Sequence, residues 1–177
     1  MIGVLVSGEG TNLQALIDAG LPIAAVASNK PGAGALARAD AAGIPNRVFE
    51  LEAYADRAAR DRELADWLQL RGVDLVVLAG YMHLLTPVFL ERCPDRIVTV
   101  HPSLLPEFPG ASALDDALAA GVETTGVTVH YVDEGLDTGA VIRQEPVAVE
   151  PRATLLDRIH AVEHRLLPEV VGELCAH

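Results

Sequence analysis

The sequence predicts an α/β protein with a mostly parallel, Rossmann-like sheet, helices on both faces and an antiparallel edge in its C-terminal half. Short runs rich in Val, Ile and Leu alternate with longer amphipathic segments rich in Ala and Leu over most of the chain. This alternation is typical of βαβ units, in which a helix connects two parallel strands. Late in the chain two strand-like runs follow one another with no helix between them, which indicates an antiparallel pair at the sheet edge.

Each expected element rests on a local pattern of apolar residues. The first half is expected to contain strand and helix pairs at 2–6 and 12–19, 23–27 and 33–42, and 47–49 and 55–70. The second half is expected to contain a strand at 75–78, a short helix from Pro87, a strand leading into His101, a helix near 114–119, strands around 127–132 and 140–147, and a helix over 154–174. The last helix has apolar residues at close to 3.6-residue spacing: Leu155, Ile159, Val162, Leu166 and Leu167.

At 177 residues, 50% of them hydrophobic, the chain is long enough for one domain with a substantial core, and we expect that domain to cover 1–177. Its apolar runs are far shorter than the ~20 residues that cross a bilayer, so we expect a soluble, cytoplasmic protein without a membrane partner. Cys93 and Cys175 show neither disulfide nor metal-ligand spacing. We therefore expect reduced cysteines and no bound metal.

The formal net charge of -12 disfavours a nucleic-acid partner, because it repels phosphate backbones. It argues in particular against a tRNA substrate. The same charge repels small anions, so a site for one needs local groups that outweigh the field of the whole chain.

His101 is the most informative candidate for chemistry. The β-branched run 97–100 precedes it, and Pro102 and Pro106 prevent the strand from continuing as regular structure. His101 therefore lies at a strand end or in its loop, where an imidazole can carry a proton near neutral pH. Taken alone, the pattern is better explained by a structural histidine at a strand edge.

A glycine-rich turn, Ser-Gly-Glu-Gly-Thr-Asn at 7–12, joins the first strand to the first helix. Main-chain N–H groups at such a helix start can hold a phosphate. Leu13 stands where a dinucleotide fingerprint needs glycine, and no Walker A motif is present. A turn that binds nothing is the alternative.

Two further loops attract attention. Residues 80–85, Gly-Tyr-Met-His-Leu-Leu, follow a hydrophobic strand at the edge where α/β sheets bind ligands, although a core-lining loop would look the same. The acidic segment 133–139 most simply forms a turn. Within it Asp137 differs from its neighbours, since the apolar Leu136 precedes it and a Thr-Gly turn follows. We expect Asp137 to lie partly buried beside His101, where a carboxylate favours a protonated imidazole.

Five blocks together resemble the folate-dependent formyltransferases, and most closely the members that formylate phosphoribosylglycinamide in purine biosynthesis. They are VLVSGEGTNL at 4–13, SNK at 28–30, LAGYM at 78–82, HPSLLP at 101–106 and LDTG at 136–139. They occur in the family's order and extend through nearly the whole chain. The resemblance implies the same α/β fold, and direct transfer of a formyl group from 10-formyltetrahydrofolate to the amine of 5-phosphoribosylglycinamide, with no metal.

The resemblance also implies roles for individual residues. The catalytic group would be His101, Asp137 and Thr99. The acceptor's phosphate would be held by Gly10, Thr11 and Asn12, and its ribose by Glu163, with His160 beside it. The folate would be bound by Arg57, Met82, His83, Leu84, Leu85, Thr99, Asp133 and Asp137. A solvated helix charge is the alternative for Arg57, and an exposed polar stripe is the alternative for the pair His160 and Glu163.

Thr99 departs from the family, which has asparagine at this position. Asparagine donates a hydrogen bond to the formyl oxygen as charge builds there, and losing one such donor typically costs ~10² to 10³ in rate. A threonine hydroxyl also donates, but from a shorter arm.

Three other activities stay open. The first is a 10-formyltetrahydrofolate hydrolase, in which water replaces the amine. The second is a methionyl-tRNA formyltransferase, which the net charge disfavours. A folate- or phosphosugar-binding homologue with little turnover is the third. For the activity that the resemblance implies we expect small-molecule substrates and a monomer or homodimer.

Overall fold

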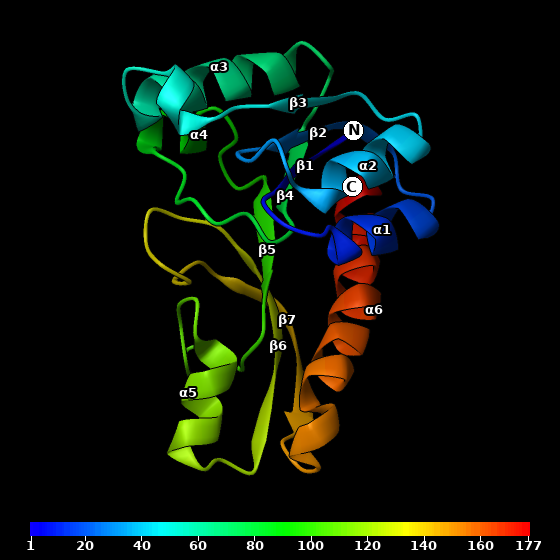
Figure 1. Cartoon of the computed structure of the whole chain (residues 1–177), viewed down its shortest axis with the longest axis vertical. Helices are drawn as coiled ribbons and strands as arrows, with labels where there is room; N and C mark the ends of the chain where they lie inside the picture. Colours follow the sequence, from blue (N-terminus) through cyan, green and yellow to red (C-terminus); the bar gives the residue numbers. More distant parts are fainter. The chain divides into compact units, whose positions relative to one another are not determined.

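Seven strands form one sheet in the order β3-β2-β1-β4-β5-β6-β7 in the computed structural model, which describes residues 1–177 (Figure 1). The strands are β1 (Ile2–Val6), β2 (Ile23–Ser28), β3 (Asn46–Val48), β4 (Leu75–Leu78), β5 (Ile97–His101), β6 (Thr124–Tyr131) and β7 (Val141–Ala148). The helices are α1 (Thr11–Asp18), α2 (Gly34–Ala41), α3 (Arg57–Gln69), α4 (Pro87–Leu90), α5 (Ala113–Ala120) and α6 (Leu155–Cys175), with short 3-10 turns at Leu51–Ala53 and Arg152–Thr154. The predicted fold class, a mostly parallel sheet with an antiparallel edge, is confirmed. The chain divides into two compact units, Met1–Val98 and Thr99–His177.

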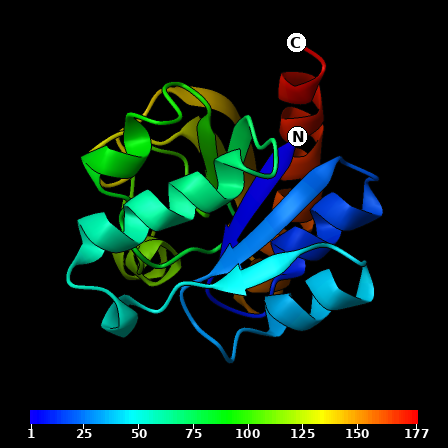
Figure 2. The same cartoon turned by 90° about the horizontal axis from the view of Figure 1, so that it is seen from above.

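The first unit has the doubly wound architecture. β1 pairs in parallel with β2 and β4, and β2 pairs in parallel with β3. Every residue of β1 and β4 is buried, which explains why both strands are continuous apolar runs in the sequence. Helix α3 lies on one face of these strands, and α1 and α2 lie on the other (Figure 2).

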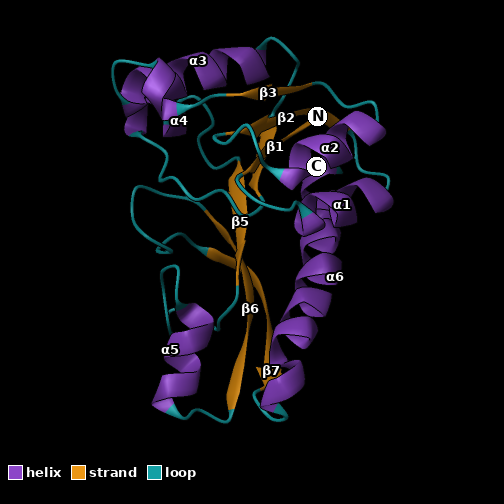
Figure 3. Cartoon of the chain, in the orientation of Figure 1, coloured by secondary structure: helices purple, strands orange, loops and turns teal.

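The second unit is built on the antiparallel pair of β6 and β7. Helices α5 and α6 lie on opposite sides of this pair (Figure 1). Helix α6 packs on both strands and buries the apolar residues Leu155, Ile159, Leu166 and Leu167. The segments 102–112 and 132–140, which follow β5 and β6, form irregular loops (Figure 3).

The element boundaries differ from the sequence expectation by a few residues. Helix α3 begins at Arg57 rather than at residue 55, because the Asp56 carboxylate caps it and accepts a hydrogen bond from Ala59 N at 2.8 Å. Strand β6 begins at Thr124, before the apolar run that predicted it. No helix is long and apolar enough to cross a membrane.

Candidate active site

The glycine-rich turn between β1 and α1 has the geometry of an anion site. Gly10 is the N-cap of α1 with φ of 77°, and no side chain caps the helix start. A Cβ atom at Gly10 would lie 2.5 Å from Cβ of Ala35 in α2, so the left-handed backbone and the close approach both require glycine. The main-chain N–H groups at such a helix start favour an anion.

The positive charge beside this turn comes from outside it. Arg38 on α2 donates from Nε to the main-chain oxygen of Glu9 at 2.7 Å, and from Nη1 to Oε1 of Gln14 at 3.4 Å. The Glu9 carboxylate lies against the start of α2, where a Cβ atom at Gly34 would be 2.8 Å from its Oε2. Arg38 thus supplies the local positive charge that an anion site needs. Sequence reasoning missed it, because it belongs to the following helix and to no local motif.

The loop at 79–86 is tied to the carboxyl ends of β1 and β2. Met82 N donates to Oγ of Ser7 at 2.9 Å, and Ser7 Oγ lies 2.5 Å from Oδ1 of Asn29. The amide nitrogen of Asn29 lies 3.3 Å from Nε2 of His83. Both Ser7 and Asn29 are buried, so these contacts fix the loop against the ends of β1 and β2.

A fully buried ion pair on α3 holds the other side of the same loop. Arg60 and Asp61 are both 0% exposed, and Arg60 donates to Oδ1 of Asp61 from Nη2 at 2.8 Å and from Nε at 3.0 Å. The third nitrogen of Arg60, Nη1, lies 2.5 Å from Nδ1 of His83. Oδ2 of Asp61 accepts hydrogen bonds from N and Oγ1 of Thr86, each at 2.8 Å.

Two ionisable groups in this loop are perturbed. Burial lowers the pKa of the His83 imidazole, and the positive charges of Arg60 and Arg57 act in the same direction. Burial raises the pKa of Tyr81 to about 12. Both side chains are therefore neutral at physiological pH, and the Tyr81 ring meets the His83 ring edge to face at 5.9 Å between centroids.

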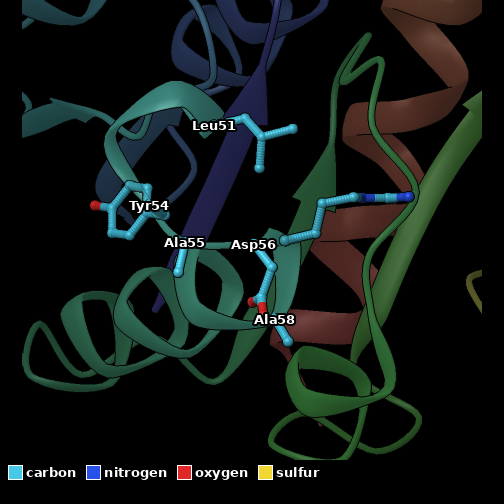
Figure 4. A pocket seen from close by; sticks show the side chains of 6 residues that line it. Leu51, Tyr54, Ala55, Asp56 and Ala58 are labelled. Atoms are coloured by element: carbon cyan, nitrogen blue, oxygen red, sulfur yellow. The ribbon is translucent and has the colours of Figure 1, made fainter.

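Four more of the residues expected at a folate, Met82, Leu84, Leu85 and Arg57, lie on or beside the same loop. Met82 and Leu84 are 62% and 51% exposed, whereas Leu85 is buried. Nη2 of Arg57 donates to the main-chain oxygen of Leu84, so Arg57 is not simply a solvated charge. Arg57 also lines an open pocket of about 470 Å³ (Figure 4). The residues that line it are Leu51, Tyr54, Ala55, Asp56, Arg57 and Ala58.

In the second unit, His101 is the last residue of β5, and Asp137 lies beside it. Nδ1 of His101 is 3.4 Å from Oδ2 of Asp137, and Nε2 of His101 is 2.8 Å from the main-chain oxygen of Phe108. His101 is only 6% exposed. Because a carbonyl only accepts, Nε2 carries a proton, and a hydrogen bond to Asp137 requires a second proton on Nδ1.

A second histidine, His130 on β6, approaches the same carboxylate. Its Nδ1 donates to the main-chain oxygen of Tyr131 at 2.7 Å, and its Nε2 lies 3.5 Å from Oδ1 of Asp137. The latter distance is at the long limit of hydrogen bonding. Asp137 is thus placed between two imidazoles. His130 was not among the predicted site residues, although it lies within the run at 127–132 that predicted β6, and it is buried together with Val129.

The backbone around this group is unusual. Asp137 and Phe108 both adopt left-handed conformations, with φ of 54° and 51°, which are uncommon for residues other than glycine. Oδ2 of Asp137 also accepts a hydrogen bond from Gly110 N at 2.8 Å. The contact with His130, then the Gly110 N–H and the charge of His101 lower the pKa of Asp137 despite its partial burial. Asp137 is therefore an anion at neutral pH.

The other predicted residues have different surroundings. Thr99 lies within β5, half-buried. Asp133 is exposed, and its Oδ1 accepts from Gly135 N and Thr138 Oγ1, so it shapes the acidic loop. Glu163 is buried on α6, whereas His160 is exposed and stacks on His164 with ring centroids 6.0 Å apart. The pair is thus not a uniformly exposed stripe. No three His, Cys, Asp or Glu side chains are grouped to hold a metal ion.

Comparison with known proteins identifies the protein family to which this chain belongs. Residues 1–171 match the model of the formyl transferase family, and the chain belongs to that family. The resemblance to folate-dependent formyltransferases is confirmed at this level.

The individual relatives are more specific. The chain is 40% identical to phosphoribosylglycinamide formyltransferase of Bacillus subtilis, over 97% of this chain and 92% of the relative. It is 44% identical to the trifunctional purine biosynthetic protein adenosine-3 of Drosophila melanogaster, but it spans only 14% of that protein's length. The crystal structure of glycinamide ribonucleotide transformylase 1 from Geobacillus kaustophilus has a TM-score of 0.94 and 44% identity, covering 98% of this chain and 97% of that one.

Proposed function

We propose that this chain transfers the formyl group of 10-formyltetrahydrofolate to the amine of 5-phosphoribosylglycinamide. The observation that carries the proposal is the contact of His101 with Asp137, which pairs a buried imidazole with a carboxylate anion. The chain has this pair in a family whose relatives of similar length are phosphoribosylglycinamide formyltransferases. We infer that it works on the same small molecules in the cytoplasm, as a monomer or homodimer, without nucleic acid or membrane.

The acceptor carries a phosphate, and we assign that group to the turn at Gly10, Thr11 and Asn12. Uncapped N–H groups at the start of α1 suit a phosphate, and Arg38 supplies positive charge beside them. We assign the ribose to Glu163, with His160 beside it.

The formyl donor carries a flat pteridine with polar edges, and we assign it to Met82, His83, Leu84 and Leu85. Apolar side chains suit the faces of such a ring, and a few fixed polar groups suit its edges. The loop has both, since exposed Met82 and Leu84 flank His83. We assign the charged glutamate tail to Arg57, and folate contacts also to Asp133.

In the proposed reaction the acceptor amine attacks the formyl carbon, the bond from that carbon to N10 of the folate breaks, and one proton moves from the amine to N10. His101 stabilises the charge that builds on the formyl oxygen and donates a proton. Asp137, an anion placed beside Nδ1 of His101, takes up and relays the amine proton. Thr99 donates a further hydrogen bond toward the formyl oxygen.

The test is tetrahydrofolate formation from 10-formyltetrahydrofolate, followed by absorbance with and without 5-phosphoribosylglycinamide. We expect turnover that depends on the acceptor. Acceptor-independent turnover would identify a hydrolase, and ligand binding without turnover would identify a binding homologue. Either result would contradict the proposal.

A further inference from the structure

The proton on His83 is located by its neighbour Arg60. A guanidinium has only donors and no acceptor. Since its Nη1 lies 2.5 Å from Nδ1 of His83, a proton on Nδ1 would place two donors against each other, one of them cationic. The ring is therefore neutral, with its one proton on Nε2.

We propose that Arg60 is a positioning residue that holds His83 as the neutral Nε2–H tautomer. The ring then bridges α3 to Asn29 and keeps the loop at 79–86 in its binding shape at physiological pH. That this loop binds the formyl donor rests on the proposed function, whereas the state of the ring does not.

The other ring nitrogen completes the bridge. Nε2 of His83 lies 3.3 Å from the amide nitrogen of Asn29, and with the proton on Nε2 a hydrogen bond needs the amide oxygen there. A half-turn of the amide about its Cβ–Cγ bond places the oxygen toward the ring and the nitrogen toward Ser7 Oγ. Ser7 Oγ also accepts a hydrogen bond from Met82 N. The hydrogen bonds that begin at His83 therefore lead back to the loop at 79–86, and each contact has one donor and one acceptor.

Arg60 cannot swing away to release the ring. It is 0% exposed, and two of its nitrogens are held by Oδ1 of Asp61. Removing one partner of such a buried pair is strongly destabilising, because the other charge is left without compensation. The guanidinium is therefore a permanent charge beside Nδ1.

The groups that face His83 from each neighbouring element act mainly in one direction. The guanidiniums of Arg60 and Arg57 on α3, and the ammonium of Lys30 after β2, disfavour a protonated ring. Asp61 on α3 opposes them, but Arg60 lies between it and His83 through the contacts described above. Tyr81 presents only a neutral ring. Burial and these cations together lower the pKa of His83.

The direct test is a ¹⁵N spectrum of the histidine rings recorded against pH, with His83 assigned through the variant His83→Gln. In the wild-type protein we expect only the Nε2–H form, down to pH values below the ordinary histidine midpoint of ~6.5. In Arg60→Met we expect the ring to become protonated at higher pH than in the wild type. Arg62→Met removes an exposed arginine of the same helix and should leave the His83 signals unchanged.

Because Arg60→Met leaves the Asp61 charge buried, the double variant Arg60→Met/Asp61→Asn is the companion. It removes both charges and keeps an acceptor for Thr86. In either variant we expect the KM for the formyl donor to rise about 10-fold at pH values where the ring is protonated, with kcat little changed, and to recover at higher pH. If the variants raised KM only by damaging the structure, KM would not change with the protonation of His83. Adding His83→Gln should abolish the pH dependence.

A wild-type ring with its proton on Nδ1 would overturn the proposal. So would a His83 titration that does not respond to the loss of Arg60 in the folded variants, or a pH-independent KM in an active variant. If the ring behaves as expected and no formyl transfer is found, the positioning by Arg60 stands and only the proposed function fails.

Discussion

His83 in the first unit and His101 in the second are both contacted by polar groups on two sides, but they face opposite charges. Nδ1 of His83 faces the guanidinium of Arg60 at 2.5 Å, whereas Nδ1 of His101 faces the carboxylate of Asp137 at 3.4 Å. A cation excludes a proton from the facing nitrogen, and an anion attracts one.

This contrast separates a histidine that maintains shape from one that exchanges protons. At His83 only one proton position is compatible with the neighbouring Arg60, so the ring has a structural role. At Asp137, by contrast, Nδ1 of His101 and Nε2 of His130 both face one carboxylate, and each contact becomes a hydrogen bond when that nitrogen is protonated. The second arrangement suits proton transfer.

The largest effect that tests this contrast should come from His101→Gln. The glutamine amide can still donate to the Phe108 oxygen, but it cannot exchange a proton. We expect kcat to fall about 10²- to 10⁴-fold with ligand affinities and melting temperature nearly unchanged. Steady-state kinetics and calorimetry measure both, with His177→Gln at the exposed C-terminus as the control. A loss of less than a few-fold would show that His101 does not supply the proton.

Asp137→Asn should have the next largest effect. Asparagine tolerates the left-handed backbone and keeps an acceptor for Gly110 N, but it removes the anion that faces both imidazoles. We expect kcat to fall about 10²-fold. A variant with normal turnover would contradict the proposed relay.

Asp137→Asn also tests how the charge of Asp137 affects stability in acid. The contacts that lower the pKa of Asp137 stabilise the folded protein at pH above the ordinary aspartate value of ~3.9, and this contribution is lost as pH falls through the lower folded value. The difference in melting temperature between wild type and Asp137→Asn should therefore shrink toward acid. A gap that stays constant with pH would show that its cause is not the charge.

How much of this contrast the sequence could predict depends on whether a local sequence pattern or only tertiary packing distinguishes each residue. The strand end at His101 and the distinct character of Asp137 were visible, because apolar runs and turn residues mark both locally. The bonding of Arg60 and Asp61 was not, since charged pairs on a helix are ordinarily solvated and only tertiary packing buries this one. Arg38 was missed for a related reason, as it meets the turn at Glu9 only in the folded chain.

The same distinction applies to the fold. Strands β1 and β4 were predicted well because burial on both faces leaves only apolar residues. The start of α3 was not, because its cap depends on the Asp56 side chain. The buried state of Glu163 on α6 was also not predictable, since helical spacing alone gave no sign that this carboxylate would be covered.

Thr99→Asn should produce a smaller change, in the opposite direction. A longer amide arm can bring an N–H closer to the formyl oxygen, and we expect kcat to rise about 10-fold, below the ~10²- to 10³-fold that one such donor can supply. Melting temperature must be measured as well, because a larger side chain in β5 can also disturb packing. A variant that folds normally, binds both ligands and gains no activity would show that Thr99 does not limit the reaction.

The smallest expected effect concerns Arg38, and it tests whether the first unit uses charge for binding alone. Arg38→Met removes the positive charge beside the turn at 8–12, and we expect the KM for 5-phosphoribosylglycinamide to rise about 10-fold while kcat stays within a few-fold of wild type. Arg38→Lys keeps the charge and should recover most of the affinity.

Calorimetry with the phosphorylated and dephosphorylated acceptor gives the sharper comparison, because only the phosphate should respond to Arg38. Gly8→Ala is the matched probe of main-chain approach, since a Cβ atom at Gly8 meets nothing within 4 Å, whereas one at Gly10 would collide with Ala35. If Gly8→Ala weakens only the phosphorylated acceptor, a phosphate lies over the turn. Equal affinities for the two acceptors in the wild-type protein would remove the phosphate site and, with it, the role assigned to Arg38.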